Sequence, residues 1–287
     1  MSYRRLLAAS LLVLLSAYPS AEQAAKVLVG YCIGLKGLET AKAARFDYVE
    51  LGTTEIASLS DSEFEESVER AKQVGIPTPN ANLFLPATLR LTGPDAMPVD
   101  EQMAYVRKAF ARLARFGVKL LCFGSGGARR VPDGFPKEEA FKQLVAFGKR
   151  IAPEAKAQGI TVVIEPLRKQ ETNIINTTAE GLELVNAVAD PNFELLVDFY
   201  HLASEKEDPT IILRARDHIR HLHMANPQGR VFPLAWDEFD YAPFFANLRQ
   251  IGYAGRISIE ASSKDVPSEA PRAIELLRRA FVEPPRE

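Results

Sequence analysis

The sequence predicts an α/β fold, a single (β/α)8 TIM barrel, on the basis of three observations. Short apolar runs rich in β-branched residues alternate with helical patterns, which is typical of parallel strands joined by helices. Eight strands and eight helices can be counted between residues 26 and 287. The length of 287 residues suits one barrel of about 250 residues with an extension. We therefore expect residues 26–287 to form one domain.

Residues 1–25 differ from the rest of the chain. Arg4 and Arg5 precede a largely apolar run at residues 6–17, which is too short to span a bilayer but is typical of a signal-peptide core. Small residues follow, including Ala21. We therefore predict a signal peptide and a periplasmic or secreted protein with no stable membrane anchor. The alternative is an amphipathic helix on the barrel floor, which would leave the protein cytoplasmic.

The first half of the predicted barrel alternates regularly. Its elements are strands at 27–33, 48–51, 80–85 and 119–123, and helices at 38–44, 61–74, 100–115 and 137–158. Asp61 and the acidic residues just after it favour a helix start, because carboxylates stabilise the positive end of the helix dipole. Glycines such as Gly75 and Gly117 end the helices.

The second half repeats the same unit. Its elements are strands at 161–164, 193–197, 219–222 and 256–259, and helices at 177–189, 209–216, 241–251 and 267–281. Pro166 cannot donate a ladder hydrogen bond, so the strand before it should end there. Thr177 or Thr178 is a suitable N-cap for the next helix.

A side chain that can bind metal follows each of these last four strands. The side chains are those of Glu165, Asp198, His223 and Glu260. The carboxyl ends of parallel strands meet at one rim of a barrel, where active sites are built. We therefore predict that the four converge on one divalent metal ion. This oxygen-rich set favours Mn²⁺ first, with Mg²⁺, Co²⁺ or Zn²⁺ as alternatives.

Two of these ligands also suit acid/base chemistry. A proton next to a carbonyl group is too weakly acidic for a bare carboxylate, but a metal that chelates two oxygens stabilises the resulting enediolate. Glu165 and Glu260 come from strands that are separated around the ring. We therefore predict that they flank the substrate and act as the acid/base pair.

Several neighbouring side chains have two interpretations each. His221 is a buried partner of the metal site or an ordinary core histidine. Glu171 and His201 contact a substrate or are simply exposed. The glycine-rich loop at 124–130 has free backbone N–H groups that suit an anionic or hydroxylated ligand. Arg129 in this loop is accordingly a substrate-binding candidate or a solvated side chain.

The composition excludes several classes of protein. A net charge of −2 gives no electrostatic sign of nucleic-acid binding. Two cysteines, Cys32 and Cys122, provide neither a disulfide framework nor a zinc-thiolate site, and we expect both to be small core residues.

The chain resembles the sugar isomerase/epimerase superfamily with a xylose isomerase-like barrel, which includes ketose 3-epimerases, hydroxypyruvate isomerase and inosose dehydratase. The resemblance rests on Glu165-Pro166-Leu167 with Glu171, Asp198-Phe199-Tyr200-His201, His221-Leu222-His223, Trp236-Asp237, Gly252-Tyr253 and Glu260. It implies that two glutamates, one aspartate and one histidine hold a divalent metal. It also implies that both glutamates exchange protons with the substrate, and that Glu171, His201 and Arg230 bind it.

The first hypothesis is accordingly a metal-dependent isomerase or epimerase of a small carbohydrate, which leaves room for a homo-oligomer. The second is a lyase that uses the same site for β-elimination from a keto sugar or a 3-keto glycoside. A DNA-repair nuclease related to endonuclease IV would need more histidines and a basic surface. A carbohydrate-binding barrel without catalysis is the fourth alternative.

Overall fold

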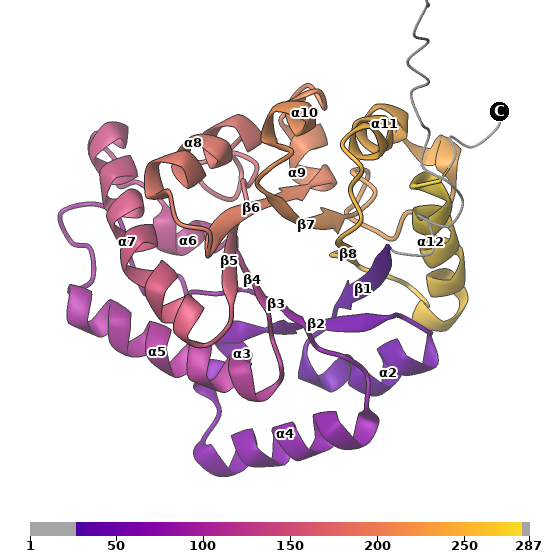
Figure 1. Cartoon of the computed structure of the whole chain (residues 1–287), viewed down its shortest axis with the longest axis horizontal. Helices are drawn as coiled ribbons and strands as arrows, with labels where there is room; N and C mark the ends of the chain where they lie inside the picture. The colour runs from indigo at the N-terminus through magenta and orange to yellow at the C-terminus, as the bar shows by residue number, and fades with distance from the viewer. Residues whose placement is uncertain (1–26, 283–287) are drawn as a thin grey trace, which may run out of the picture.

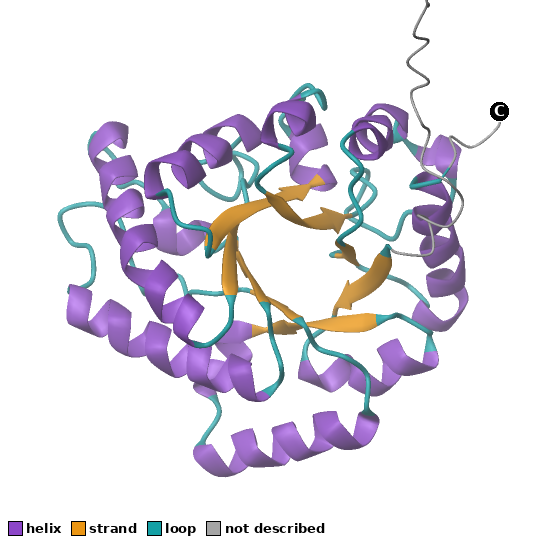
Figure 2. Ribbon diagram, viewed as in Figure 1, coloured by secondary structure: helices purple, strands orange, loops and turns teal. Residues whose placement is uncertain are grey.

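The structure, a computed structural model, describes residues 27–282 and contains a closed barrel of eight parallel strands in sequence order. The strands are β1 (Leu28–Cys32), β2 (Tyr48–Gly52), β3 (Asn80–Asn82), β4 (Leu120–Phe123), β5 (Thr161–Ile164), β6 (Phe193–Asp198), β7 (Ile219–Met224) and β8 (Arg256–Ile259). The last strand pairs with the first, which closes the ring seen in Figure 2. The predicted (β/α)8 barrel is confirmed.

Helices surround this ring (Figure 1). They are α2 (Leu38–Ala43), α3 (Thr53–Ser58), α4 (Asp61–Val74), α5 (Val99–Arg115), α6 (Gly126–Arg129), α7 (Lys137–Ala157), α8 (Thr178–Val188), α9 (Phe199–Ser204), α10 (Ile211–Ala215), α11 (Ala242–Gln250) and α12 (Val266–Ala280), with 3-10 turns η1 (Leu35–Gly37) and η2 (Trp236–Glu238). The longer helices match the predicted ones to within a few residues.

Three short helices were not predicted, and each begins at or within three residues of a strand's carboxyl end. These are α3 after β2, α6 after β4 and α9 after β6. The predicted strand at 80–85 is also shorter, because Leu83 adopts a positive φ of 50° that turns the chain out of β3. The barrel's active rim therefore has more helical structure than its sequence pattern suggests.

Local chemistry explains the helix ends. Ser60 accepts a hydrogen bond from the backbone N–H of Glu63, whose carboxylate accepts one from the Ser60 N–H, a capping box that begins α4. Gly75 ends the same helix at a φ of 69°, where glycine has no steric cost.

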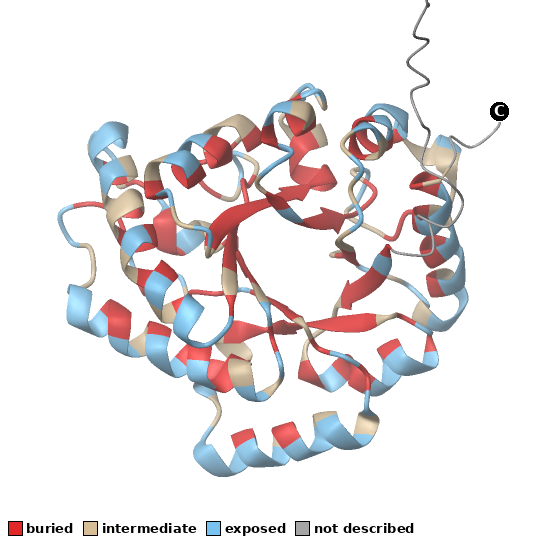
Figure 3. Ribbon diagram, viewed as in Figure 1, coloured by how far each residue is buried: buried red, intermediate tan, exposed pale blue. Residues whose placement is uncertain are grey.

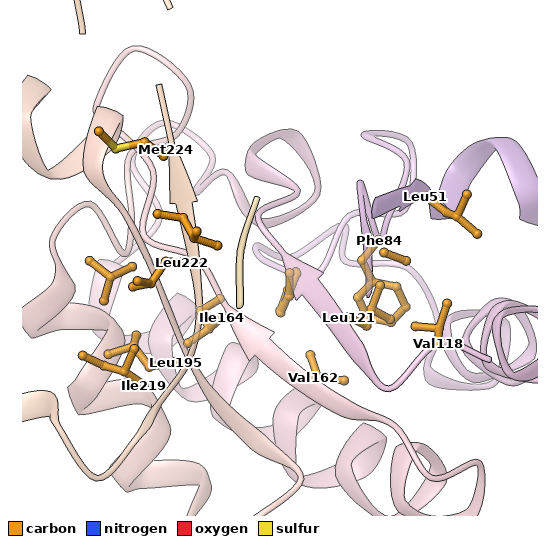
Figure 4. Packing of buried hydrophobic residues seen from close by; sticks show 14 of the residues in the cluster. Leu51, Phe84, Val118, Leu121, Val162, Ile164, Leu195, Ile219, Leu222 and Met224 are labelled. Carbon is orange, nitrogen blue, oxygen red and sulfur yellow. The ribbon is translucent and has the colours of Figure 1, made fainter. Parts of the chain in front are cut away.

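The hydrophobic core lies between the strands and the helices. Figure 4 shows apolar side chains such as Leu121, Ile164 and Leu222 packed in this layer, and Figure 3 shows buried strands inside a ring of helices whose outer faces are exposed. A smaller apolar group inside the barrel consists of Cys122, Val163 and Leu196. The prediction of a core cysteine holds for Cys122, whereas Cys32 is partly exposed at the barrel rim.

The remainder of the barrel interior is polar. Tyr48 on β2 crosses the interior, and its hydroxyl lies 2.8 Å from the Ser258 hydroxyl on β8. The ring of Tyr48 occupies the space that a side chain on Gly30 would need, since an ideal Cβ there would lie 2.2 Å from the ring. Glycine at position 30 is therefore required by this close approach.

Arg129, on the short helix α6, is completely buried. Its guanidinium donates hydrogen bonds to the carbonyl oxygens of Phe123, at 3.1 Å, and Glu165, at 2.7 Å. Burial lowers the pKa of Arg129 to about 10, which still leaves it charged at neutral pH. Arg129 thus connects the carboxyl ends of β4 and β5.

None of the helices in residues 27–282 is long and apolar enough to cross a membrane. The predicted signal peptide at residues 1–25 lies outside the described residues, and so export and the domain boundary at residue 26 stay predictions.

The role of Arg129 can be tested through stability. Arg129→Met keeps most of the side-chain volume but leaves the Glu165 carbonyl oxygen without its donor, which costs about 1–3 kcal/mol. Arg130→Met is the matched control, because Arg130 is exposed and makes one bond to the Glu171 carbonyl oxygen; we expect a change within about 0.5 kcal/mol. Urea unfolding measures both, and equal effects would contradict the assigned role.

Candidate active site

The four predicted metal ligands lie at the carboxyl ends of four adjacent strands. Glu165 directly follows β5, Asp198 ends β6, His223 is the next-to-last residue of β7, and Glu260 directly follows β8. Asp198 and His223 pair in the β6–β7 register. The closed parallel barrel therefore brings together side chains that lie up to 95 positions apart, from 165 to 260.

The distances within this group suit a metal centre. His223 Nδ1 lies 3.0 Å from Glu165 Oε1 and 3.5 Å from Glu260 Oε2. Ligand-type atoms of three predicted ligands, Glu165, Asp198 and Glu260, lie within 4.8 Å of one another together with His201, whereas the predicted ligand His223 groups with Glu165 and Cys122 instead. Asp198 Oδ2 is buried and makes no hydrogen bond within residues 27–282. A buried carboxylate oxygen facing other acidic groups fits a cation, because such an oxygen otherwise loses its hydration without compensation.

Two histidines approach this centre in different ways. His201 Nδ1 accepts a hydrogen bond from the backbone N–H of Arg168 at 3.2 Å, so a neutral ring carries its proton on Nε2. That nitrogen lies 3.5 Å from Asp198 Oδ2 and 4.0 Å from Glu171 Oε2. His201 therefore presents a donor to the site, which suits a substrate hydroxyl better than a metal ion.

Charge and burial set the protonation of the centre. Burial raises the pKa of Asp198 to about 6, and nearby His201 offsets only part of this effect. Burial also raises the pKa of Glu165, but the charge and hydrogen bond of His223 outweigh it, and the pKa falls to about 2. Glu165 is therefore ionised at neutral pH and can accept a proton.

A pocket of about 510 Å³ opens above this centre. Its lining comprises Asn82, Leu83, Gly124, Ser125, Gly126, Glu165, Leu167, Glu171, Gly229, Arg230, Glu260, Ala261 and Ser262. An ideal Cβ on Gly124 would lie 2.4 Å from Glu165 Oε2, so the absence of a side chain there lets the carboxylate reach the pocket. The two predicted catalytic glutamates and two predicted substrate-binding residues share this pocket.

Arg230 connects the two acidic sides of the pocket. Its guanidinium lies 2.6 Å from Glu260 Oε2 and 3.3 Å from Glu171 Oε1, and it stacks 4.7 Å from the centre of the Tyr200 ring. Burial lowers the pKa of Arg230, but Glu260, Asp198 and Glu171 outweigh it and raise the pKa, so this side chain stays charged. Arg168 stacks on Tyr200 as well, at 4.8 Å.

Arg129 does not reach this pocket. Helix α6 turns its side chain into the wall between β4 and β5, where it binds backbone carbonyl oxygens. The sequence predicts a loop at 124–130 and therefore an accessible arginine, and the structure does not support that prediction.

Glu50 is the important residue that sequence analysis missed. It lies on β2 with no exposed surface, and its carboxylate contacts both His221 and His223. Burial raises the pKa of Glu50, but these two histidines outweigh it and hold the pKa well below the ordinary value. The sequence feature that could have identified Glu50 is its position as the single carboxylate inside the apolar run Tyr48–Leu51. His221 is also buried and contacts Glu50, which is compatible with both interpretations given above, a partner of the metal site or a core histidine.

Known proteins resemble this chain in sequence and in structure. The family model described as "Xylose isomerase-like TIM barrel" matches residues 38–280. L-ribulose 3-epimerase of Methylomonas sp. (strain DH-1) is 30% identical over 236 residues, which are 80% of this chain and 79% of that protein. D-psicose 3-epimerase of Agrobacterium fabrum is 26% identical over 225 residues, which are 75% of this chain and 74% of that protein.

The crystal structure of D-allulose 3-epimerase from Methylomonas sp. in complex with D-allulose superposes with a TM-score of 0.78 at 25% sequence identity. It covers 92% of this chain and 99% of that chain. Because the family model spans most of the residues that form the barrel, the protein belongs to the xylose isomerase-like TIM-barrel family and is a sugar isomerase or epimerase.

Proposed function

We propose that the protein is a divalent-metal-dependent ketose epimerase that moves a proton at the carbon next to the carbonyl group. The observation that carries this proposal is the position of Glu165 and Glu260, which line one pocket and both contact His223. The named 3-epimerases among its relatives support the same reaction.

Glu165, Asp198, His223 and Glu260 would hold the cation, with Mn²⁺ the first candidate. Once bound, the cation supplies Lewis-acid stabilisation of the negative charge that develops on two neighbouring substrate oxygens. The close approach of the three carboxylates, and the oxygen atom of Asp198 that has no hydrogen bond within the described residues, support this assignment.

Glu165 and Glu260 are the acid/base pair in this proposal. Their environments differ, because Glu165 is nearly buried while the Glu260 side chain is 20% exposed. Asn82 donates to Glu260 Oε1 at 3.3 Å, and Arg230 holds Glu260 Oε2. Each carboxylate is thus held by fixed neighbours, so one face of the substrate carbon can lose a proton and the opposite face can gain one.

Glu171, His201 and Arg230 would bind the substrate hydroxyl groups. His201 presents its Nε2–H group, and Glu171 presents acceptor oxygens at the pocket wall. Arg230 is the one cation among the described residues that line the pocket, and it is already paired with two carboxylates. This charge balance favours an uncharged sugar over a sugar phosphate.

A panel of substrates tests the reaction class. We expect interconversion of C3 epimers among free ketoses such as D-allulose, D-fructose, D-tagatose and L-ribulose, with solvent deuterium entering the product at C3. Elimination products from 3-keto glycosides, with no ketose turnover, would instead establish the lyase alternative, which the same acid/base pair would support. Turnover without any label entry would argue against proton transfer through a solvent-exchanging base.

Replacing the acid/base pair should abolish most of the activity. Glu165→Gln and Glu260→Gln keep the size of each side chain but remove its basicity, so kcat should fall by roughly 10²–10⁴-fold. Glu171→Gln should instead mainly raise KM, because this residue binds and does not exchange protons. Glu154→Gln, a carboxylate that is paired with Arg107 on the outer helices α7 and α5, is the control. Steady-state kinetics on the preferred ketose would refute the pair if either variant retained full kcat.

Metal removal should lower both activity and stability. A ligand at about 100 times its Kd stabilises the folded state by about 2.7 kcal/mol, so chelation should lower Tm by roughly 5–10 °C. Asp198→Asn should shrink this shift, and excess Mn²⁺ should restore part of its activity. Differential scanning calorimetry with and without Mn²⁺ measures the effect. Full activity in the chelated protein, with an unchanged Tm, would exclude the metal site.

A further inference from the structure

The carboxylate of Glu50 lies directly beneath the candidate metal centre without lining the pocket. It has no exposed surface, and it comes from β2, three strands around the barrel from β5, which Glu165 follows. Glu50 Oε1 lies 3.0 Å from His223 Nε2, and Glu50 Oε2 lies 2.8 Å from His221 Nε2. One buried carboxylate thus joins two histidines of the same strand.

This carboxylate is itself fixed in place. Ser258 donates a hydrogen bond to Glu50 Oε2 at 2.6 Å, and the Tyr48 hydroxyl lies 2.8 Å from the Ser258 hydroxyl. Tyr48 has its position because Gly30 leaves room for its ring. The carboxylate therefore has one orientation, and it imposes that orientation on the imidazole above it.

The two nitrogens of His223 consequently have different roles. Nε2 faces the Glu50 carboxylate, which only accepts hydrogen bonds, so Nε2 must carry the proton. Nδ1 also faces carboxylates, those of Glu165 and Glu260, so it donates to Glu165 when no cation is bound. A cation held by these carboxylates would take the place of the Nδ1 proton, whereas Nε2 would keep its proton and its hydrogen bond to Glu50. A carboxylate behind a ligating histidine commonly fixes the tautomer in this way.

We propose that Glu50 is the positioning residue that makes Nδ1 of His223 a metal-binding atom. The inference rests on the proposed metal dependence, but not on which sugar is the substrate. It also explains why His201 has another role: its Nδ1 is occupied by the Arg168 N–H, so it directs a proton, and not a lone pair, at the site.

The first test measures metal affinity. Glu50→Gln keeps the size of the side chain. Its NH₂ group is a donor, however, and would face one of the N–H or O–H donors that now bind the carboxylate, so one hydrogen bond is lost. Mn²⁺ titration followed by calorimetry or electron paramagnetic resonance should show binding that is about 10–100-fold weaker than in the unchanged protein. Excess Mn²⁺ should then recover part of kcat with KM nearly unchanged.

Glu194→Gln is the matched control. Glu194 also binds a histidine, with Oε2 at 2.9 Å from His218 Nδ1, but it lies near the amino end of β6, away from the pocket. We expect its Mn²⁺ affinity to be unchanged. If Glu50→Gln folds, binds Mn²⁺ with unchanged affinity and only lowers Tm, Glu50 has a purely structural role and the proposal is wrong.

The second test needs no variant at Glu50, so it can be carried out even if Glu50→Gln does not fold. The chain has only four histidines, and two-bond ¹H–¹⁵N spectra distinguish their tautomers, with assignment through His218→Gln and His223→Asn. In protein loaded with Zn²⁺, a diamagnetic ion, His223 should carry its proton on Nε2. A proton on Nδ1 would overturn the proposal.

Neither test measures catalytic turnover, so the proposed role of Glu50 and the proposed epimerase function can fail independently of each other. If Mn²⁺ binding depends on Glu50 but no ketose is epimerised, the function is wrong and the role of Glu50 stands. If ketoses are epimerised but the Mn²⁺ affinity does not depend on Glu50, the proposed function stands and the role of Glu50 is wrong.

Discussion

The contact of the buried Glu50 carboxylate with both His221 and His223 is the interaction on which the arrangement of side chains inside this barrel depends. A carboxylate without exposed surface is costly unless several donors surround it, and here two imidazoles and the Ser258 hydroxyl do so. Those donors come from β7 and β8, whereas Glu50 comes from β2. The pairing therefore constrains how three strands are placed around the ring.

The register of β7 shows how strict this constraint is. Leu195 pairs with Ile219, but the next residue, Leu196, pairs with His221, so β7 contains one extra residue at Arg220. Side chains alternate along a strand, so a shift of one residue moves the following side chains to the other face. Ile219 packs outside the barrel with Leu195, whereas His221 reaches Glu50 inside it.

The barrel interior is divided into an apolar part and a polar part. Cys122, Val163 and Leu196 form the apolar part, below Glu165 and Asp198, while the network around Glu50 lies below His223. The apolar floor explains why burial dominates the raised pKa of Asp198. Of the four proposed ligands only His223 is bonded to the polar part, through Glu50, so the ligands differ in the groups that support them from below.

Sequence alone predicted the parts of the site that depend on strand ends. Glu165, Asp198, His223 and Glu260 were identifiable because each follows or ends an apolar run, and parallel strands bring such ends to one rim. Glu50 was not identifiable, because its meaning depends on partners 171 and 173 positions away. Arg129 was misjudged because a glycine-rich segment predicts an open loop, whereas the chain forms a short helix that buries the side chain.

The two histidines nearest the pocket illustrate why geometry carries more information than residue type. His201 and His223 are both nearly inaccessible, and both are held through the ring nitrogen that faces away from the pocket. For His201 the partner is a backbone N–H donor, and for His223 it is a carboxylate acceptor. The nitrogen on the pocket side is therefore a donor in His201, whereas in His223 we propose that it is the atom that binds the cation. The proposed site, which would hold a cation and orient a hydroxyl group, uses one histidine of each kind, and the partner of the outward ring nitrogen decides which histidine takes which role.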